Sequence, residues 1–247
     1  MTDDAVPGAI GRARQYVGGE RDIGEYLLSS RSLAEYRAMF SLSSEDLELR
    51  ILDCPGGGSS FTASVNAKGG DVTAVDPVYD RSPEQVAAMV SAEVARGSAW
   101  TVANLDRYRW DFYGDADGHR RVRTDSARIF GADIVADSAK YQPGALPELP
   151  FADKAFDLVL CSHLLFTYSD RLDRDFHRLA IVEMARVGSQ VRIYPLAHQS
   201  GSDERDLVAE LVTMLPSHGL RASIVPVSYE FQRGAGEMLV VSRAVRA

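Results

Sequence analysis

The stretch LRILDCPGGGSSF (residues 49–61) joins a short apolar run to a turn of three consecutive glycines. Glycine tolerates positive φ and lets a backbone approach a ligand closely, and a helix that begins after the turn presents free N–H groups. The stretch is therefore typical of a nucleotide-binding turn, with a redox loop and a simple tight bend as alternative interpretations. Its glycines follow neither the G-x-G-x-x-G spacing of dinucleotide sites nor the Gly-Lys-Ser/Thr of a phosphate loop.

Strands and helices alternate along the rest of the chain. The apolar runs LRILDC, DVTAVD, KAFDLVLCS and QVRIYPL predict strands, and residues 221–232 and 236–245 predict a final pair. Helices are predicted at 61–68, 170–188 and 202–219. We expect Asp170 to cap the helix at 170–188 and Gly188 to end it. This alternation favours an α/β fold with a doubly wound, mostly parallel sheet.

A long insertion interrupts the alternation. Residues 77–138 separate the second strand from a short strand within 139–146, which is more chain than a crossover helix needs. The segment holds two helical patterns and several aromatic residues, which are more often core than substrate cage. We expect it to form a helical cap over the carboxyl edge of the sheet, where α/β folds bind substrates. We expect its basic cluster HRRVRTDSAR (119–128) to be a solvated helix face.

Composition narrows the class of protein. The chain has 247 residues, is 45% hydrophobic and 25% charged, and carries a net charge of −8. We expect one domain over residues 1–247, with a mobile arm at 1–22, and binding to neither nucleic acid nor membrane. Two cysteines, no apolar signal core and no membrane-length apolar run favour a reducing, cytoplasmic setting. No cluster of side chains in the sequence has clear metal-ligand spacing. The sequence leaves open whether the protein forms a homodimer.

Asp76 ends the second predicted strand. An acidic side chain at this place can accept hydrogen bonds from both hydroxyls of a ribose. A turn or a helix cap is the alternative, because Asp-Pro often opens turns.

Three motifs, ILDCPGGGSS, VTAVDPVY and GALPELPFADKAFDLVLCSHLLFTY, together resemble the class I S-adenosylmethionine-dependent methyltransferases over residues 49–195, apart from the insertion. The resemblance implies a Rossmann-like sheet of seven strands with an antiparallel last strand, and a helical lid at 23–48. It implies S-adenosylmethionine as the cofactor. Two departures stand out: Pro55 and Ser59 replace the first and third glycines of the turn, and Ala145 replaces an acidic contact to the adenine.

The resemblance also implies a set of cofactor-binding residues. They are Arg31, Tyr36, Met39, Asp53, Pro55, Gly56, Gly57, Gly58, Asp76, Tyr79, Gly144, Ala145, Leu146 and Ser162. Asp53 and the glycine turn would flank the methionine moiety, Asp76 the ribose, and Tyr79 with residues 144–146 the adenine. Ser162 would face the sulfonium, while Tyr36 and Met39 would close the lid. Arg31 would pair with the methionine carboxylate, or be an ordinary surface arginine.

His163 is the candidate general base, because it follows a strand that ends at the centre of the site and histidine titrates near neutral pH. A structural histidine is the alternative. Tyr168 and Tyr194 would orient the substrate or offer a π face to the sulfonium. We expect O- or N-methylation of a small molecule. One alternative is a cyclase or lyase that consumes S-adenosylmethionine and releases methylthioadenosine; another is a non-catalytic S-adenosylmethionine-binding module.

Overall fold

A seven-stranded sheet lies at the centre of the structure, a computed structural model that describes residues 26–200 and 204–244. The predicted arm at 1–22 lies outside these residues. The strand order is β3-β2-β1-β4-β5-β7-β6, with β7 antiparallel to both of its neighbours. The strands are β1 Arg50–Asp53, β2 Asp71–Val75, β3 Tyr141–Gln142, β4 Phe156–Ser162, β5 Gly188–Tyr194, β6 Leu220–Pro226 and β7 Glu237–Arg243. The prediction of a doubly wound, mostly parallel sheet with an antiparallel last strand is confirmed.

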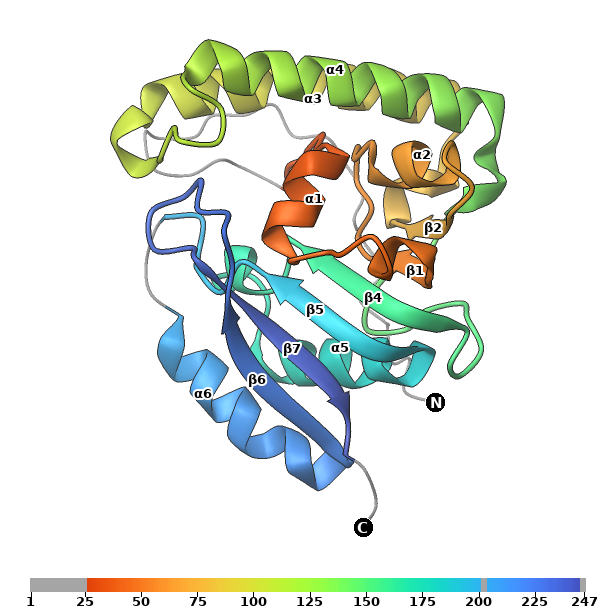
Figure 1. Cartoon of the computed structure of the whole chain (residues 1–247), viewed down its shortest axis with the longest axis vertical. Coiled ribbons are helices and arrows are strands. Elements are labelled where there is room, and N and C mark those ends of the chain that lie inside the picture. The colour runs from red at the N-terminus through yellow and green to blue at the C-terminus, as the bar shows by residue number, and fades with distance from the viewer. Residues whose placement is uncertain (1–25, 201–203, 245–247) are drawn as a thin grey trace, which may run out of the picture.

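Within the part of the chain that the structure describes, six α-helices surround this sheet (Figure 1). They are α1 Leu33–Met39, α2 Phe61–Asn66, α3 Pro83–Ala103, α4 Ala116–Ala136, α5 Arg174–Val187 and α6 Arg205–Met214. Helices α5 and α6 cover one face of the sheet, and α1 with α2 cover the other.

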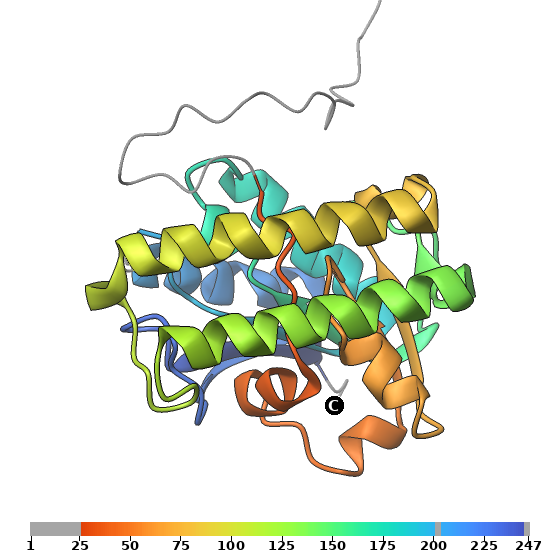
Figure 2. The same cartoon turned by 90° about the horizontal axis from the view of Figure 1, so that it is seen from above.

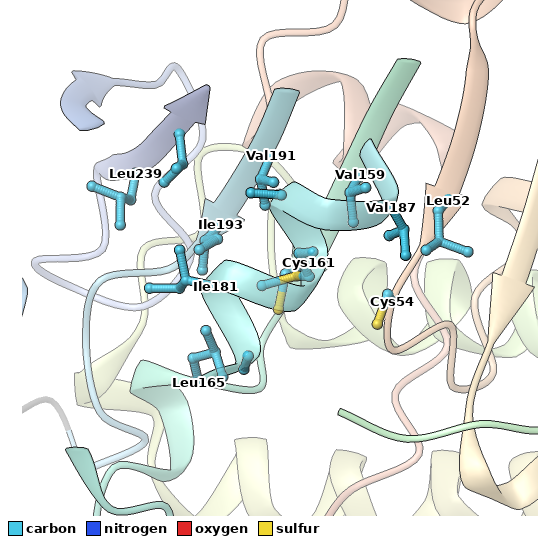
Figure 3. Packing of buried hydrophobic residues seen from close by; sticks show 14 of the residues in the cluster. Leu52, Cys54, Val159, Cys161, Leu165, Ile181, Val187, Val191, Ile193 and Leu239 are labelled. Carbon is cyan, nitrogen blue, oxygen red and sulfur yellow. The ribbon is translucent and has the colours of Figure 1, made fainter. Parts of the chain in front are cut away.

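The central strands are buried on both faces, as their continuous apolar sequences predict. In β4, Leu158 and Leu160 pack towards α1 and α2. Val159 and Cys161, whose side chains point the opposite way, pack towards α5 and α6 (Figure 3). This alternation arises because successive side chains of a strand point to opposite faces.

Capping side chains explain where the helices begin. Ser32 and Glu35 form a reciprocal capping box at the start of α1. Asp173, and not the expected Asp170, caps α5 by accepting a hydrogen bond from the N–H of Phe176. The expected stop, Gly188, directly follows α5 and is already the first residue of β5.

The residues between β2 and β3 form the two 21-residue helices α3 and α4, which pack side by side across the carboxyl edge of the sheet (Figures 1 and 2). The loop between them reaches the β6–β7 connection, where the N–H of Arg109 donates to the carbonyl of Phe231 at 2.7 Å. The expected solvated face at 119–128 is only partly correct. His119 and Arg123 point inward and are 5% and 7% exposed.

Candidate functional site

The glycine turn lies where the strand order reverses, between β1 and β4, which is where open α/β sheets bind ligands. Gly57 has φ of +52°, a conformation that disfavours any residue with a Cβ. A Cβ on Gly56 would come within 2.6 Å of the Tyr79 hydroxyl, and one on Gly58 would overlap Val90 of α3. The chain's own packing therefore requires these glycines, whatever ligand approaches the turn. Pro55, directly before these glycines, is joined to Cys54 by a cis peptide bond.

Asp76 and Tyr79 both bind the glycine turn. Asp76 follows β2, and its two carboxylate oxygens accept the N–H groups of Gly57 and Val78, each at 3.0 Å. Burial raises the pKa of Asp76 to about 6, although these two backbone hydrogen bonds lower it. The Tyr79 hydroxyl donates to the carbonyl of Gly57 at 2.8 Å. These hydrogen bonds connect the end of β1 to the end of β2. Asp76 also caps the turn that follows it, which is the role that the sequence offered as the alternative to binding a ribose.

Asp53 is a second buried carboxyl group beside the same turn. It ends β1, is fully buried, and accepts a hydrogen bond from the Tyr36 hydroxyl of α1 at 2.9 Å. Its other oxygen, Oδ2, has no hydrogen-bond partner among the described residues. Burial raises the pKa of Asp53 well above its usual value. Tyr36 thus joins α1 to the end of β1.

The two cysteines do not support the interpretation of the glycine turn as a redox loop. Cys54 and Cys161 are free and lie in the apolar cluster beneath the sheet (Figure 3). Burial raises the pKa of Cys54 well above its usual value and that of Cys161 to about 12. Both thiols are therefore protonated at neutral pH and behave as small apolar side chains.

The expected adenine turn lies next to Asp76. The N–H of Asp76 donates to the carbonyl of Gln142 in β3, and a Cβ on Gly144 would come within 2.8 Å of Val75. Ala145 is exposed and Leu146 is half-buried. Residues 144–146 and Asp76 therefore lie at the same edge of the sheet.

The ends of β4 and β5 bring Ser162, His163 and Tyr194 together. The backbone N–H of His163 donates to the carbonyl of Tyr194 at 2.7 Å, and its Nδ1 lies 2.9 Å from the Ser162 hydroxyl. Burial, and then the charges of Arg31 and Arg123, lower the pKa of His163 well below its usual value. The expectation that His163 titrates near neutral pH is corrected, because its buried imidazole is held in the neutral form.

The hydroxyls of the other two candidate tyrosines already have partners. The Tyr194 hydroxyl donates to the carbonyl of Ala235 at 2.7 Å, which holds the β6–β7 connection against β5. The Tyr168 hydroxyl accepts the N–H of Leu27 at 3.0 Å, and the Arg171 guanidinium lies 5.5 Å from the Tyr168 ring centre. The Arg171 guanidinium thus already lies over the Tyr168 ring, which was expected either to orient the substrate or to offer a π face to the sulfonium.

Residues 26–32 cross the site beneath α3 and α4 before entering α1 (Figure 2). The carbonyl of Arg31 accepts hydrogen bonds from the Ser60 N–H at 2.9 Å and the Ser126 hydroxyl at 2.7 Å. Ser29 lies against Gly57. The segment therefore covers the glycine turn. Met39, by contrast, is fully buried in the apolar cluster around α1 and α2.

A buried ionic group joins α1 to α4, and sequence reasoning missed it. Glu35 is fully buried, 2.6 Å from Arg123 Nη1 and 3.4 Å from Arg31 Nη1. The hydroxyls of Tyr113 and Tyr229 also donate to it. Arg123 lies at helical spacing from the buried residues of α4, and this pattern could have shown that its side chain points inward. No feature of the neighbouring sequence identified Glu35 as its partner.

The described residues offer little else that resembles a site. They hold no group of three His, Cys, Asp or Glu side chains arranged for a metal ion, and none of their helices has the length and apolar character to span a membrane. Two open cavities, of about 530 and 610 Å³, lie at the starts of α5 and α6 and between α2 and α4. Neither is lined by a residue of the glycine turn.

The sequence matches no protein-family model. An uncharacterised protein of Methanocaldococcus jannaschii is 26% identical over 228 residues, which cover 90% of this chain and 98% of that protein. The magnesium protoporphyrin IX methyltransferase of Synechocystis, solved with bound S-adenosylmethionine, is 13% identical with a TM-score of 0.44, and the match covers 86% of this chain and 78% of that enzyme. A Pyrococcus horikoshii protein described provisionally as an RNA methyltransferase is 11% identical with a TM-score of 0.44, covering 86% of this chain and 82% of that one.

The strand order itself identifies the fold. Seven strands in the order β3-β2-β1-β4-β5-β7-β6, with β7 antiparallel, form the sheet that the sequence resemblance implied. The chain therefore has the Rossmann-like α/β fold, with an antiparallel last strand, that the resemblance implied.

Proposed function

We propose that this chain is an S-adenosylmethionine-dependent methyltransferase that acts on an oxygen or nitrogen atom of a small molecule. The observation that carries the proposal is the placement of Asp53 and Asp76 on either side of the glycine turn at the switch point. Carboxyl oxygens can accept hydrogen bonds from ribose hydroxyls and from an ammonium group, whereas they offer a pyrophosphate no positive charge. A nucleoside that carries an amino acid and no phosphate fits this pair.

Each carboxyl group keeps capacity for a ligand. A carboxylate oxygen can accept two hydrogen bonds, so Asp76 can receive ribose hydroxyls while it still holds Gly57. The unpartnered Oδ2 of Asp53 can accept the ammonium of the methionine moiety. Tyr79 and residues 144–146 lie on the ribose side of the turn and would border the adenine.

Methyl transfer needs the acceptor atom aligned behind the methyl group, which is mainly a matter of positioning and exclusion of water. His163 and Ser162, at the end of β4, would face the acceptor, with His163 as the base. A small acceptor is favoured because the cap and residues 26–32 cover the site. The net charge of −8 disfavours a nucleic-acid acceptor.

Calorimetry with S-adenosylhomocysteine tests the cofactor, and Asp76→Ala tests the site. Losing the carboxylate contacts to ribose should weaken binding by about 1.5–3 kcal/mol, or roughly 10- to 150-fold. Asp80→Ala, an exposed change in the same turn, is the matched control and should leave affinity unchanged. An Asp76→Ala affinity within twofold of the wild type would refute the ribose assignment.

A second candidate is a cyclase or lyase that consumes S-adenosylmethionine without a methyl acceptor. The observation in its favour is the cover over the turn, where Ser29 lies against Gly57 and Val90 against Gly58. Product analysis separates the two: S-adenosylhomocysteine formed only with a cell extract supports methyl transfer. Methylthioadenosine formed without an acceptor supports the second candidate, and binding without turnover supports a non-catalytic module.

A further inference from the structure

A serine, a histidine and an aspartate come together away from the glycine turn. The Ser200 hydroxyl lies 2.7 Å from Nδ1 of His198, and Nε2 of the same ring lies 3.0 Å from Oδ1 of Asp170. All three side chains line the open cavity of about 530 Å³ at the starts of α5 and α6. The proposed methyl transfer uses none of them.

The hydrogen bonds of His198 determine which of its ring nitrogens carries the proton. The backbone N–H of Ser200 donates to Nδ1 at 3.1 Å, so Nδ1 is an acceptor and has no proton. Nε2 then carries the proton and donates it to Asp170. The Ser200 hydroxyl therefore donates to the lone pair of Nδ1, which is the orientation that a general base requires.

Asp170 is available to hold this histidine because Asp173, and not Asp170, caps α5. Burial raises the pKa of Asp170, but hydrogen bonds from His198 and Arg171 outweigh burial and hold that pKa below its usual value. Asp170 is therefore a carboxylate at neutral pH. A carboxylate in this position orients the imidazole and stabilises the imidazolium that forms when the ring accepts a proton.

We propose that Ser200 and His198 form a second, hydrolytic site, with Asp170 as its positioning residue, that cleaves small uncharged esters. A nucleophile hydrogen-bonded to a base, with the base in turn held by a carboxylate, is the arrangement that activates a serine for acyl transfer. The side chain of His198 is 13% exposed and Ser200 is exposed, so a substrate can reach the hydroxyl from the cavity. This site is separate from the proposed cofactor site, because no residue of the glycine turn lines its cavity.

The reaction needs water as its only co-reactant. Oγ of Ser200 bonds to the ester carbonyl carbon while its proton passes to Nδ1 of His198. The bond from that carbon to the alcohol oxygen then breaks, and His198 gives the proton to the leaving oxygen. Water attacks the acyl group in the same way, with His198 taking its proton and returning it to Ser200 as the acid leaves. Arg174 lines the same cavity and would stabilise the negative charge on the carbonyl oxygen.

The remaining lining residues indicate which esters the cavity admits. Leu172 and Leu207 offer apolar surface to an acyl chain. The carboxyl groups of Asp173 and Glu204 lie on the same cavity and would repel an anionic ester. An uncharged ester with a short acyl chain therefore fits best.

Hydrolysis of p-nitrophenyl acetate by the full chain tests the proposal. We expect Ser200→Ala and His198→Gln each to lower kcat/KM by about tenfold or more. Ser217→Ala and His218→Gln, exposed changes just after α6, are the matched controls and should keep the wild-type rate. All four side chains lie outside the apolar clusters, so thermal unfolding should give the wild-type melting temperature for each variant.

Asp170→Asn distinguishes a positioning role from a purely structural one. The asparagine amide can donate to Nε2, which moves the ring proton to Nδ1 and removes the acceptor from the Ser200 hydroxyl. We expect kcat to fall by about tenfold or more while KM stays within about twofold of the wild type. Asp175→Asn, whose side chain is 81% exposed on α5, is the control and should change neither constant.

Diisopropyl fluorophosphate tests the nucleophile directly. Oγ of Ser200 would displace fluoride from phosphorus, and peptide mass spectrometry locates the adduct. We expect an adduct on Ser200 of the wild type that forms about tenfold or more slowly in His198→Gln. Wild-type ester hydrolysis by Ser200→Ala would overturn the proposal. An adduct that forms on Ser200 equally fast in His198→Gln would do the same, as would a wild type that shows neither hydrolysis nor the adduct.

Discussion

Replacing Glu35 by glutamine should strongly destabilise the protein, because it leaves Arg123 and Arg31 buried without a counter-ion. Breaking a buried ion pair by removing one partner costs about 3–5 kcal/mol. The lowered pKa of Glu35 leads to a similar free-energy cost. Burial alone would raise it, but the charges of Arg123 and Arg31 and hydrogen bonds from Tyr113 and Ser32 lower it from 4.5 to about 2. At about 1.4 kcal/mol per unit, this shift is worth about 3 kcal/mol.

The sign of the pH dependence follows from the direction of that shift. The pKa of Glu35 is lower in the folded state, so its stabilisation is complete above pH 4.5 and is lost as the pH falls towards 2. The difference in unfolding free energy between the wild type and Glu35→Gln should be largest at pH 7 and should shrink below pH 4.5. Urea unfolding followed by circular dichroism at pH 7, 4.5 and 3.5 measures it.

An exposed ion pair provides the control. Arg174 and Glu210 lie 2.9 Å apart with side chains 73% and 43% exposed, and Arg174→Gln should cost less than about 1 kcal/mol. A Glu35→Gln protein that loses less than about 1 kcal/mol at pH 7, or whose loss is the same at all three pH values, would refute the reasoning.

Three further changes test the glycine turn. Asp76 has a pKa raised from 3.8 to about 6, so its contribution to stability is present below pH 3.8 and is lost as the pH rises through 6. Urea unfolding without added ligand should therefore shift in favour of the wild type over Asp76→Asn by about 2 kcal/mol between pH 6 and pH 4. Gly58→Ala should cost about 1–3 kcal/mol in thermal unfolding because its Cβ overlaps Val90, and Val90→Ala should recover part of that loss if the overlap is the cause. Tyr36→Phe removes the donor to Asp53 and should cost about 1–3 kcal/mol; a change below 0.5 kcal/mol in urea would show that the hydrogen bond contributes little.

Local signals were sufficient to predict an α/β fold with a mostly parallel sheet, while the seven strands and the antiparallel last strand were predicted from the family resemblance. The runs at β1, β2 and β4 are mostly apolar on both faces, and a strand with that pattern is typical of a sheet covered on both sides. Helix caps are also local signals. The predicted cap of α5, Asp170, is wrong by three residues, because Asp173 caps the helix. The turn after β1 and the acid after β2 were recognised for the same reason, because a glycine turn and a strand-ending aspartate are visible within a few residues.

What only the tertiary structure decided is how these local pieces meet. The contact between Glu35 and Arg123 joins residues 88 positions apart, and no periodicity in either helix identifies the partner of the other. The pKa of His163 depends on burial by distant segments and on the charge of Arg31, so its residue type alone predicted the wrong titration range. Local sequence sets backbone conformation and which side chains are apolar. Burial and charge pairing arise only when the segments pack, and in this chain they decide which ionisable groups of the site carry charge.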